Sequence, residues 1–299
     1  HNGMDVDLKM ASRVTGIDVI LGGHSHDGVP EPSPVKNSGG ITLVCNAGSN
    51  GKFLGVLDFS VKNGQVKDYQ YRLLPVFANL LAADREMQSY IDQVRAPYLG
   101  KLTEKLATTD HLLYRRGNFN GPFDQLICDA LRIQNDAQIA LSPGFRWGTT
   151  VLPNQEITME DVLNHTCITY PETYTREMSG VEIKRVLEDV CDNLFNPDPY
   201  WQQGGDMVRV GGMDYVCDPT QTINQRISGM TLNDGTPIDI NKRYKVAGWA
   251  TVKNQSAGQP VWEVVADYLR DRKVVQLDKI NTPKLVNIAD NPGLADYSI

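Results

Sequence analysis

Hydrophobic residues follow two spacings near the start of the chain. Between Asp7 and Val14 they recur at helical intervals, which predicts a helix. The run Ile17–Leu21 holds four apolar residues out of five, which predicts a short buried strand. A glycine pair follows at residues 22–23, so we expect the chain to leave the strand in an irregular turn.

The next fifty residues predict a sheet. Residues 28–40 contain three prolines and several glycines, which predicts a loop. Strands are expected at 41–45 and 53–61. Asn63-Gly64 is the pair that favours a two-residue hairpin turn, here into a strand at 66–73.

Helical and extended patterns alternate in the rest of the chain. Apolar residues at helical spacing predict a helix at 84–99 that Pro97 ends or kinks, and a helix that carries Pro122 in its first turn. Thr158 and the pair Ser179/Glu182 have the sequence of helix N-caps. We expect further strands at 138–141, 207–216, 226–232 and 244–249, and helices at 159–165, 181–194 and 261–269.

These elements predict an α/β segment followed by an α+β domain. We place the first domain at residues 1–77, a linker helix at 78–105 and the second domain at 106–299. The length of 299 residues and the 41% share of hydrophobic residues suit two ordinary domains with sizeable cores.

Charge and composition exclude several classes of partner. A net charge of -7 argues against a nucleic-acid partner, because binding to phosphates draws most of its affinity from Lys and Arg. We expect no membrane partner, since every apolar run is shorter than the roughly 18 residues that span a bilayer. The chain opens on His1 without a basic and then apolar leader, so no signal peptide is expected in it.

The five cysteines are widely spaced, at positions 45, 128, 167, 191 and 217. Their spacing excludes a Cys-x-x-Cys zinc or redox motif, and an odd number cannot all pair within the chain. We expect buried free thiols. At most two disulfides can form, and the sequence does not choose among the pairings.

Two histidines mark the candidate chemistry of the first domain. His24 and His26 follow the predicted strand in the run Gly-Gly-His-Ser-His, and one residue separates them. On a turn bent by glycines, both imidazoles can converge on one metal ion or on a metal pair. The alternative for a histidine after a strand is packing or capping.

Several motifs together resemble the bimetal 5'-nucleotidase family of calcineurin-like metallophosphoesterases. They are the Gly-Gly-His-Ser-His turn, the His-x-Gly at residues 1–3 and the Ser-Pro-Gly-Phe-Arg loop at 142–146. Within that family, residues 112–121, 168–174 and 200–212 look like the SoxB thiosulfohydrolases of sulfur oxidation. The resemblance implies the C-terminal part of a metal-binding β-sandwich and helix domain, followed by the family's C-terminal α+β domain.

The resemblance also implies a metal pair, a partner and a compartment. By their match to the family motifs, His1 and His24 would bind one ion and His26 the other, with Mn2+ as the metal. The partner would be a sulfur-carrier protein of the SoxYZ type with a cysteine-bearing C-terminal tail, and the compartment would be the periplasm. Two such cations activate a shared water as hydroxide.

Four residues of the second domain are candidates for substrate binding. The resemblance places Arg146 where the family binds the substrate anion. Arg209 offers a planar cation suited to a sulfonate or phosphate, with a solvated arginine on a strand as the alternative. Tyr170 and Tyr174 are expected to line the pocket, although tyrosines near a proline turn are commonly core residues.

The remaining polar residues have simpler expected roles. His111 and His165 match no ligand position and are expected to pack or to lie at helix ends. The pair Arg115-Arg116 either guides an anionic carrier tail or is a solvated loop, and Asp206 is a turn or site residue.

The sequence is compatible with three functions. The first is a dimanganese thiosulfohydrolase that releases sulfate from a cysteine-S-thiosulfonate on the carrier; the others are a 5'-nucleotidase-like phosphoesterase on small phosphates and a non-catalytic substrate-binding module. The position expected to carry a base-stacking aromatic holds Met207, which argues against nucleotides. The family's Asp-x-His, Gly-Asp and Gly-Asn-His-Glu motifs do not occur in these 299 residues, so we expect a fragment that is nearly inactive on its own.

Overall fold

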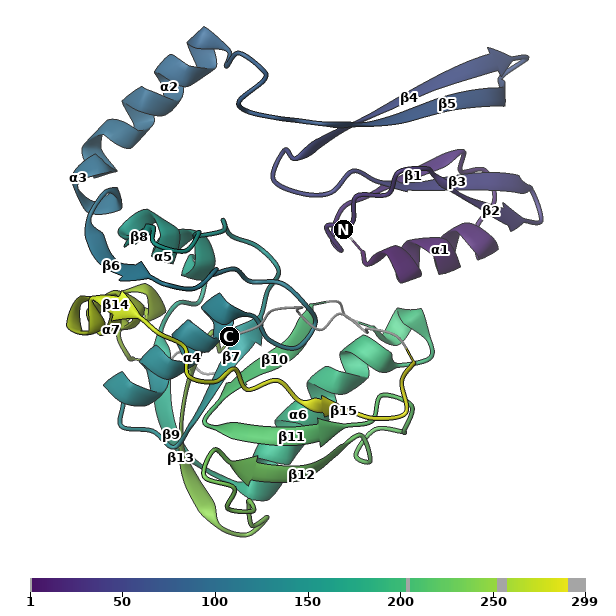
Figure 1. Cartoon of the computed structure of the whole chain (residues 1–299). Coiled ribbons are helices and arrows are strands. Elements are labelled where there is room, and N and C mark those ends of the chain that lie inside the picture. The colour runs from purple at the N-terminus through teal and green to yellow at the C-terminus, as the bar shows by residue number, and fades with distance from the viewer. Residues whose placement is uncertain (1, 203–204, 252–256, 290–299) are drawn as a thin grey trace. The chain divides into compact units, whose positions relative to one another are not determined.

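The computed structural model describes residues 2–202, 205–251 and 257–289. The chain divides into two compact units (Figure 1). Unit 1 comprises residues 1–94 and 196–204, and unit 2 comprises 95–195 and 205–299. The first division falls inside the predicted linker at 78–105. The return of residues 196–204 to unit 1 was not predicted from the sequence.

Unit 1 contains a small sheet beside one helix. Its elements are α1 (Met4–Arg13), β1 (Val19–Gly22), β2 (Ser33–Asn37), β3 (Gly40–Asn46), β4 (Phe53–Lys62), β5 (Gln65–Pro75) and η2 (Pro199–Trp201). The sheet order is β1-β3-β2, with β1 and β3 parallel, and α1 packs on all three strands. Helix α2 (Arg85–Arg95) follows the second hairpin and crosses the boundary between the units.

The loop predicted at 28–40 is wrong, because β2 lies inside it. Strand β2 is at the edge of its sheet and pairs on one side with β3. Proline lacks an N–H, and an edge strand tolerates this because one side of the strand needs no partner. Pro34 therefore fits the strand that its presence seemed to exclude.

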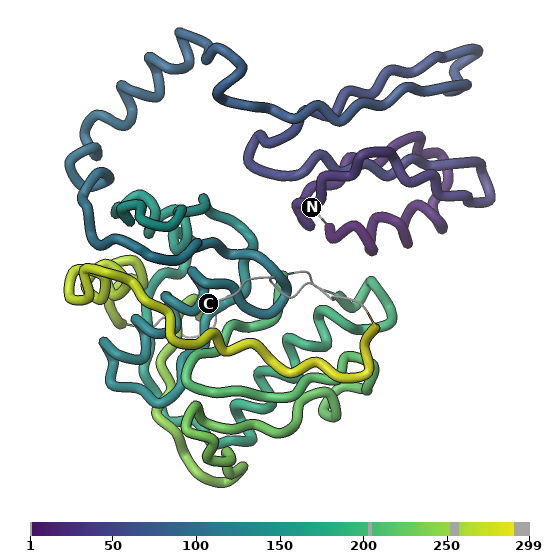
Figure 2. The backbone as a smooth tube through the Cα atoms, viewed as in Figure 1, coloured from purple at the N-terminus to yellow at the C-terminus, as the bar shows by residue number. Residues whose placement is uncertain are grey.

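The second hairpin forms as predicted. Strands β4 and β5 pair antiparallel across Asn63-Gly64, and both turn residues have positive φ, at 55° and 71°. This is the backbone of a turn that matches the twist of the strands. Figure 2 shows the long two-stranded ribbon that results.

Unit 2 is built on a four-stranded mixed sheet of order β10-β7-β13-β9. Its strands are β7 (Ile139–Gly144), β9 (Thr173–Ser179), β10 (Asp206–Gly211) and β13 (Arg243–Trp249). Helices α4 (Pro122–Gln134) and α6 (Gly180–Phe195) pack on it, and α7 (Val261–Arg272) packs against α4. The remaining elements are η1 (Ala96–Tyr98), α3 (Leu99–Leu102), β6 (Lys105–Thr109), β8 (Glu156–Thr158), α5 (Met159–Thr166), β11 (Met213–Cys217), β12 (Ile227–Leu232), β14 (Val274–Val275) and β15 (Lys284–Leu285).

Alternation along the sheet separates two cores. Ala140 packs with α4 and α7, whereas its neighbours Ile139 and Leu141 pack with α6. Successive side chains on a strand point to opposite faces, so the helices lie on the two sides of the sheet. The predicted mix of strands and helices is thus confirmed. The sheet lies between two helical layers, and loops leave it at the ends of its strands.

Local sequence determines where several helices and strands begin or end. Two helices begin at capping boxes, and one predicted strand is interrupted at a glycine. Thr158 accepts from the Asp161 N–H, and the Glu182 carboxylate accepts from the Ser179 N–H. The strand predicted at 207–216 is instead β10 and β11, which separate at Gly212, where φ is +80°. Described helices include none long and apolar enough to cross a membrane.

A core substitution in α4 tests this packing. Leu126 is fully buried, so Leu126→Ala is expected to lower the free energy of unfolding by about 2–5 kcal/mol through lost contacts and a cavity. Ile133 lies on the same helix but is 49% exposed, and Ile133→Ala is expected to cost less than about 1 kcal/mol. Urea unfolding of both variants measures the difference; equal losses would contradict the assignment of the core face.

Candidate functional site

The candidate site is built on the loop that follows β7. Gly144 ends the strand, and a Cβ added there would lie 2.3 Å from the Met207 carbonyl oxygen of β10. Only glycine permits this approach of the two backbones. Two residues on, Arg146 places its Nε 2.9 Å from Oδ1 of Asp206, and its side chain is 28% exposed. Arg146 thus lies where solvent reaches it.

Aromatic rings support this loop. Phe145 and Trp147 stack with centroids 3.9 Å apart, and Trp249 meets Phe145 edge-on at 6.2 Å. The indole N–H of Trp249 donates to the Ser142 hydroxyl at 2.8 Å, so the buried ring has its polar group satisfied. The loop is therefore held against the sheet on both sides of Arg146.

Arg209 of β10 is fully buried beneath the loop. Its Nη2 donates to Asp206 at 3.1 Å and to the Gly117 carbonyl at 2.9 Å, and its Nε lies 3.4 Å from Asp124. The guanidinium is thus surrounded by acceptors of the protein itself. Its position favours a structural role: it holds Asp206 and the loop that contains Gly117. Direct contact with a substrate anion is disfavoured.

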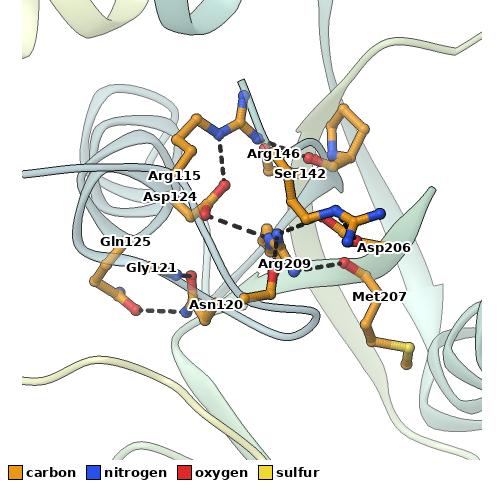
Figure 3. Close-up of polar contacts among 12 residues, drawn as sticks. Arg115, Asn120, Gly121, Asp124, Gln125, Ser142, Arg146, Asp206, Met207 and Arg209 are labelled. Atoms are coloured by element: carbon orange, nitrogen blue, oxygen red, sulfur yellow. Dashed lines mark hydrogen bonds and ion pairs between the residues drawn. The ribbon is translucent and has the colours of Figure 1, made fainter. Parts of the chain in front are cut away.

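Asp124, in the first turn of α4, continues the same chain of charges. Its Oδ1 accepts from Nε of Arg115 at 2.7 Å, and both side chains are fully buried. Arg115 also donates to the carbonyls of His165 and Pro143, at 2.6 and 2.9 Å. Figure 3 shows these guanidinium and carboxylate groups converging from α4, β10 and the two loops. Arg115 is therefore no solvated loop residue, and the solvated alternative is wrong for it.

The alternation of charges has an electrostatic consequence. In order, the groups are Arg115, Asp124, Arg209, Asp206 and Arg146, which gives three cations to two anions. We call this set the ion chain. Burial raises the pKa of Asp206, while the guanidinium groups of Arg209 and Arg146 act in the opposite direction. The set has one more cation than anions, and Arg146 is the member that solvent reaches.

The two tyrosines lie in different settings. Tyr170 is 43% exposed in the loop before β9. Tyr174 is half-buried on β9, with the Arg176 guanidinium 4.6 Å from its ring centroid. A Cβ at Gly248 would come within 2.4 Å of the Tyr174 hydroxyl, so glycine is required beneath it. Burial raises the pKa of Tyr174, with Arg176 opposing.

A cavity of about 320 Å³ opens beside the ion chain. Tyr174, Arg176 and Trp249 line it, as does Asp206, the partner of Arg146. A small anionic group bound by Arg146 would therefore have room beside it for the part of the molecule that carries the group.

The histidine turn of unit 1 is held by its neighbours. The Asn46 side chain donates to the Ser25 hydroxyl at 3.0 Å, and the Asp27 carbonyl accepts from the Gly48 N–H at 2.7 Å. His26 has a φ of +60°, which is uncommon outside glycine. Both His24 and His26 are partly exposed on this turn, and His1 lies outside the described residues.

These histidines alone do not meet the needs of a metal pair. In the described part of the chain, no group of three or more His, Cys, Asp or Glu side chains could hold a metal ion. Two dications close together need anionic oxygen ligands between them, and Asp27 beside His26 is not part of any such group. The described residues therefore do not fit a complete dimetal centre.

His165 packs beside the ion chain. The ring is fully buried and stacks on Phe123 with centroids 3.7 Å apart, as expected for a packing histidine. Desolvation and the nearby positive charge of Arg115 lower its pKa to about 3, against a smaller opposite effect from the Thr149 backbone.

The structure brings some predicted residues together and adds others. Arg146 and Arg209 meet at Asp206, and Tyr174 lines the cavity next to them. Asp124 was missed as a site residue because its sequence signal is that of an ordinary acidic residue in the first turn of a helix.

Comparison with known proteins identifies the family of unit 2. The family described as 5'-nucleotidase, C-terminal domain, matches residues 102–264. The trifunctional nucleotide phosphoesterase YfkN of Bacillus subtilis is 27% identical over 83% of this chain and 17% of its own length. The 5'-nucleotidase of Bos taurus is 24% identical over 92% of this chain and 56% of its own.

Solved structures agree with this result. The sulfate thiohydrolase SoxB of Thermus thermophilus, solved with glycerol, superposes with a TM-score of 0.89 and 35% identity, covering 97% of this chain and 54% of that protein. A 5'-nucleotidase precursor from Thermus thermophilus has a TM-score of 0.80 at 22% identity, covering 97% of this chain and 63% of that protein. The chain thus spans little more than half the length of these two proteins.

Removal of one buried charge tests the ion chain. Asp124→Asn leaves Arg115 and Arg209 facing a neutral amide, and is expected to lower the free energy of unfolding by roughly 3–5 kcal/mol. Asp136 follows the same helix with a fully exposed side chain, so Asp136→Asn is expected to leave the free energy of unfolding nearly unchanged. Denaturant melts compare the two; an Asp124→Asn protein as stable as wild type would refute the pairing.

His165 predicts a pH dependence of stability. Its pKa of about 3 lies below the unfolded value near 6.5, so its contribution is present above pH 6.5 and is lost as pH falls toward 3. Between pH 7 and pH 5 the free energy of unfolding is expected to fall by roughly 2 kcal/mol because of His165. His165→Gln is expected to flatten that slope, whereas His111→Gln, at a partly exposed side chain, keeps it. Urea unfolding at the two pH values decides, and an unchanged slope in His165→Gln counts against the assignment.

Proposed function

Because the chain belongs to the 5'-nucleotidase family, we propose that it supplies the anion-binding half of a hydrolase, with Arg146 as the residue that binds the substrate's anionic group. One observation carries this proposal. The ion chain holds one more cation than anions, and its exposed end is Arg146. A buried arginine whose charge is already paired cannot serve an incoming anion in this way.

The geometry of Arg146 suits a tetrahedral oxyanion. Its ion pair with Asp206 uses Nε, which leaves the terminal Nη groups for a ligand. Guanidinium groups bind sulfonate and phosphate oxygens through parallel N–H donors, and hydrogen bonds to charged acceptors are the stronger kind. The ion pair with Asp206 holds the Arg146 guanidinium near this position, so less side-chain freedom is lost on binding.

We propose a cysteine-S-thiosulfonate (Cys-S-S-SO3−) on the carrier as the substrate. Water would add to the terminal sulfone sulfur, the bond between that sulfur and the adjacent sulfur would break, and the products would be hydrogen sulfate and a cysteine persulfide on the carrier. The 35% identity to a SoxB over 97% of this chain supports this choice. Met207 is fully buried and provides no surface on which a nucleobase can stack.

A second candidate is a phosphoesterase that acts on nucleotides or other small phosphates. Tyr170 favours it, because this residue is 43% exposed and carries an aromatic ring of the kind that stacks on a base. The curated relatives that match the chain are named nucleotidases or nucleotide phosphoesterases, which also supports this candidate.

The metal, the partner and the compartment are part of the same proposal. Two Mn2+ ions would activate water and neutralise charge on the transferred group. We propose His1, His24 and His26 as ligands, with the anionic donors supplied from outside these 299 residues. The partner would be a SoxYZ-like carrier with a cysteine-bearing tail, and the site of action the periplasm.

Substitution of Arg146 tests the proposal on the intact protein that contains this chain. Arg146→Ala is expected to lower kcat/KM about 10–100-fold, since it removes charge-assisted hydrogen bonds to the anion. Arg132 is the matched control, because its side chain is 27% exposed and is also paired with a carboxylate. Arg132→Ala is expected to retain kcat/KM within about twofold.

The substrate is decided by two assays on the same preparation. Sulfate release from a thiosulfonated cysteine peptide is expected to exceed phosphate release from a nucleoside monophosphate by at least about 100-fold. Preference for the nucleotide would replace the thiosulfohydrolase with the second candidate. Loss of neither activity in Arg146→Ala would refute the role of Arg146 in both.

A further inference from the structure

Two cysteines outside the ion chain lie side by side in the second core of unit 2. Cys191 is near the end of α6 and Cys217 is the last residue of β11. Their Sγ atoms are 3.6 Å apart, and both side chains are fully buried. Neither has a part in the proposed hydrolysis.

Polar contacts link the helix that carries Cys191 to the strand that pairs with Cys217. Glu188, one turn before Cys191 on α6, is buried and accepts from the Ile227 N–H at 2.8 Å. Ile227 is the direct cross-strand partner of Cys217 in the β11–β12 ladder. Arg226 adds an ion pair to Asp192 at 2.6 Å. Residues on either side of Cys191 in α6 therefore bind residues 226 and 227, and Ile227 pairs in turn with Cys217.

We propose that Cys191 and Cys217 form a disulfide bond when the chain folds in an oxidising environment. A disulfide has a sulfur–sulfur distance of about 2.05 Å, so the two sulfurs need to approach by about 1.5 Å from their separation in the reduced chain. The oxidant is a disulfide, either small or protein-borne. Two thiols and one external disulfide become the Cys191–Cys217 bond and two external thiols, through a mixed disulfide.

The bond forms before the second core closes. The thiolate is the species that attacks a disulfide, and full burial excludes the oxidant from both sulfurs in the folded chain. The hydrogen-bonded Cys217 thiol and burial together raise the pKa of Cys191, which further suppresses its thiolate. The folded reduced chain is accordingly inert to oxidation, and the folded oxidised chain to reduction.

The crosslink would restrain the segment of chain that contains strand β10. The 26-residue separation between the cysteines includes β10, which carries Asp206 and Arg209. Closing a loop of this length restricts the unfolded chain, so the bond raises the melting temperature of the unit. Of the other cysteines, Cys45 and Cys128 are buried and Cys167 is exposed.

Refolding of the full chain with oxidised glutathione tests the proposal. We expect three alkylatable thiols after denaturation, against five for the chain refolded with reductant, and one peptide pair that joins positions 191 and 217. The oxidised wild type is expected to melt roughly 5–15 °C higher than the reduced wild type. That comparison needs no variant.

Two variants sharpen the result. Cys191→Ala is expected to keep all four of its thiols and to lose the difference in melting temperature, whereas Cys167→Ser keeps the crosslink and the difference. Five free thiols in the oxidised wild type, or a crosslink between any other pair, would overturn the proposal. The outcome is separate from the proposed hydrolysis, because none of these readouts measures activity.

Discussion

Buried charges that must be paired are the constraint on which unit 2 depends. Arg115, Asp124 and Arg209 are each removed from water, and each is compensated by an opposite charge or by backbone carbonyls. An unpaired charge at such a depth would cost several kcal/mol. This pairing holds together the first turn of α4, strand β10, the loop that contains Arg115 and Gly117, and the loop after β7. Arg146 lies in the last of these and is positioned by it.

This constraint connects the fold to its chemistry. The sheet brings the ends of β7 and β10 together, and the required glycine at 144 lets the two backbones approach. Within the ion chain, Arg146 is the one arginine that solvent reaches. The histidine turn is a separate feature of unit 1, and its two imidazoles would need anionic donors from outside these residues to hold a metal pair. The proposed role of the chain, binding and orientation of an anion for a hydrolase, rests on the first of these two features.

Local signals in the sequence predicted local structure well. The caps at Thr158 and Ser179 and the turn at Asn63-Gly64 form as expected, because their hydrogen bonds and dihedral angles involve residues close in sequence. The motif loop singled out Arg146, whose role in binding an anion stays a prediction. Burial of Arg209 was not foreseeable, since its partner Asp124 is 85 positions away and only the fold brings them together. Pro34 misled the prediction of β2, because the sequence does not show which strand lies at an edge.

The most direct test of the account is the affinity of this chain for inorganic sulfate, measured by calorimetry in a double-mutant cycle of Asp206→Asn and Arg146→Gln. If Asp206 positions Arg146, then Asp206→Asn weakens binding, and has little further effect when Arg146→Gln is already present. If Asp206 acts only as a negative charge near the anion, its removal tightens binding instead. Tighter binding by Asp206→Asn, or additive effects of the two substitutions, would contradict the ion chain as the basis of anion recognition.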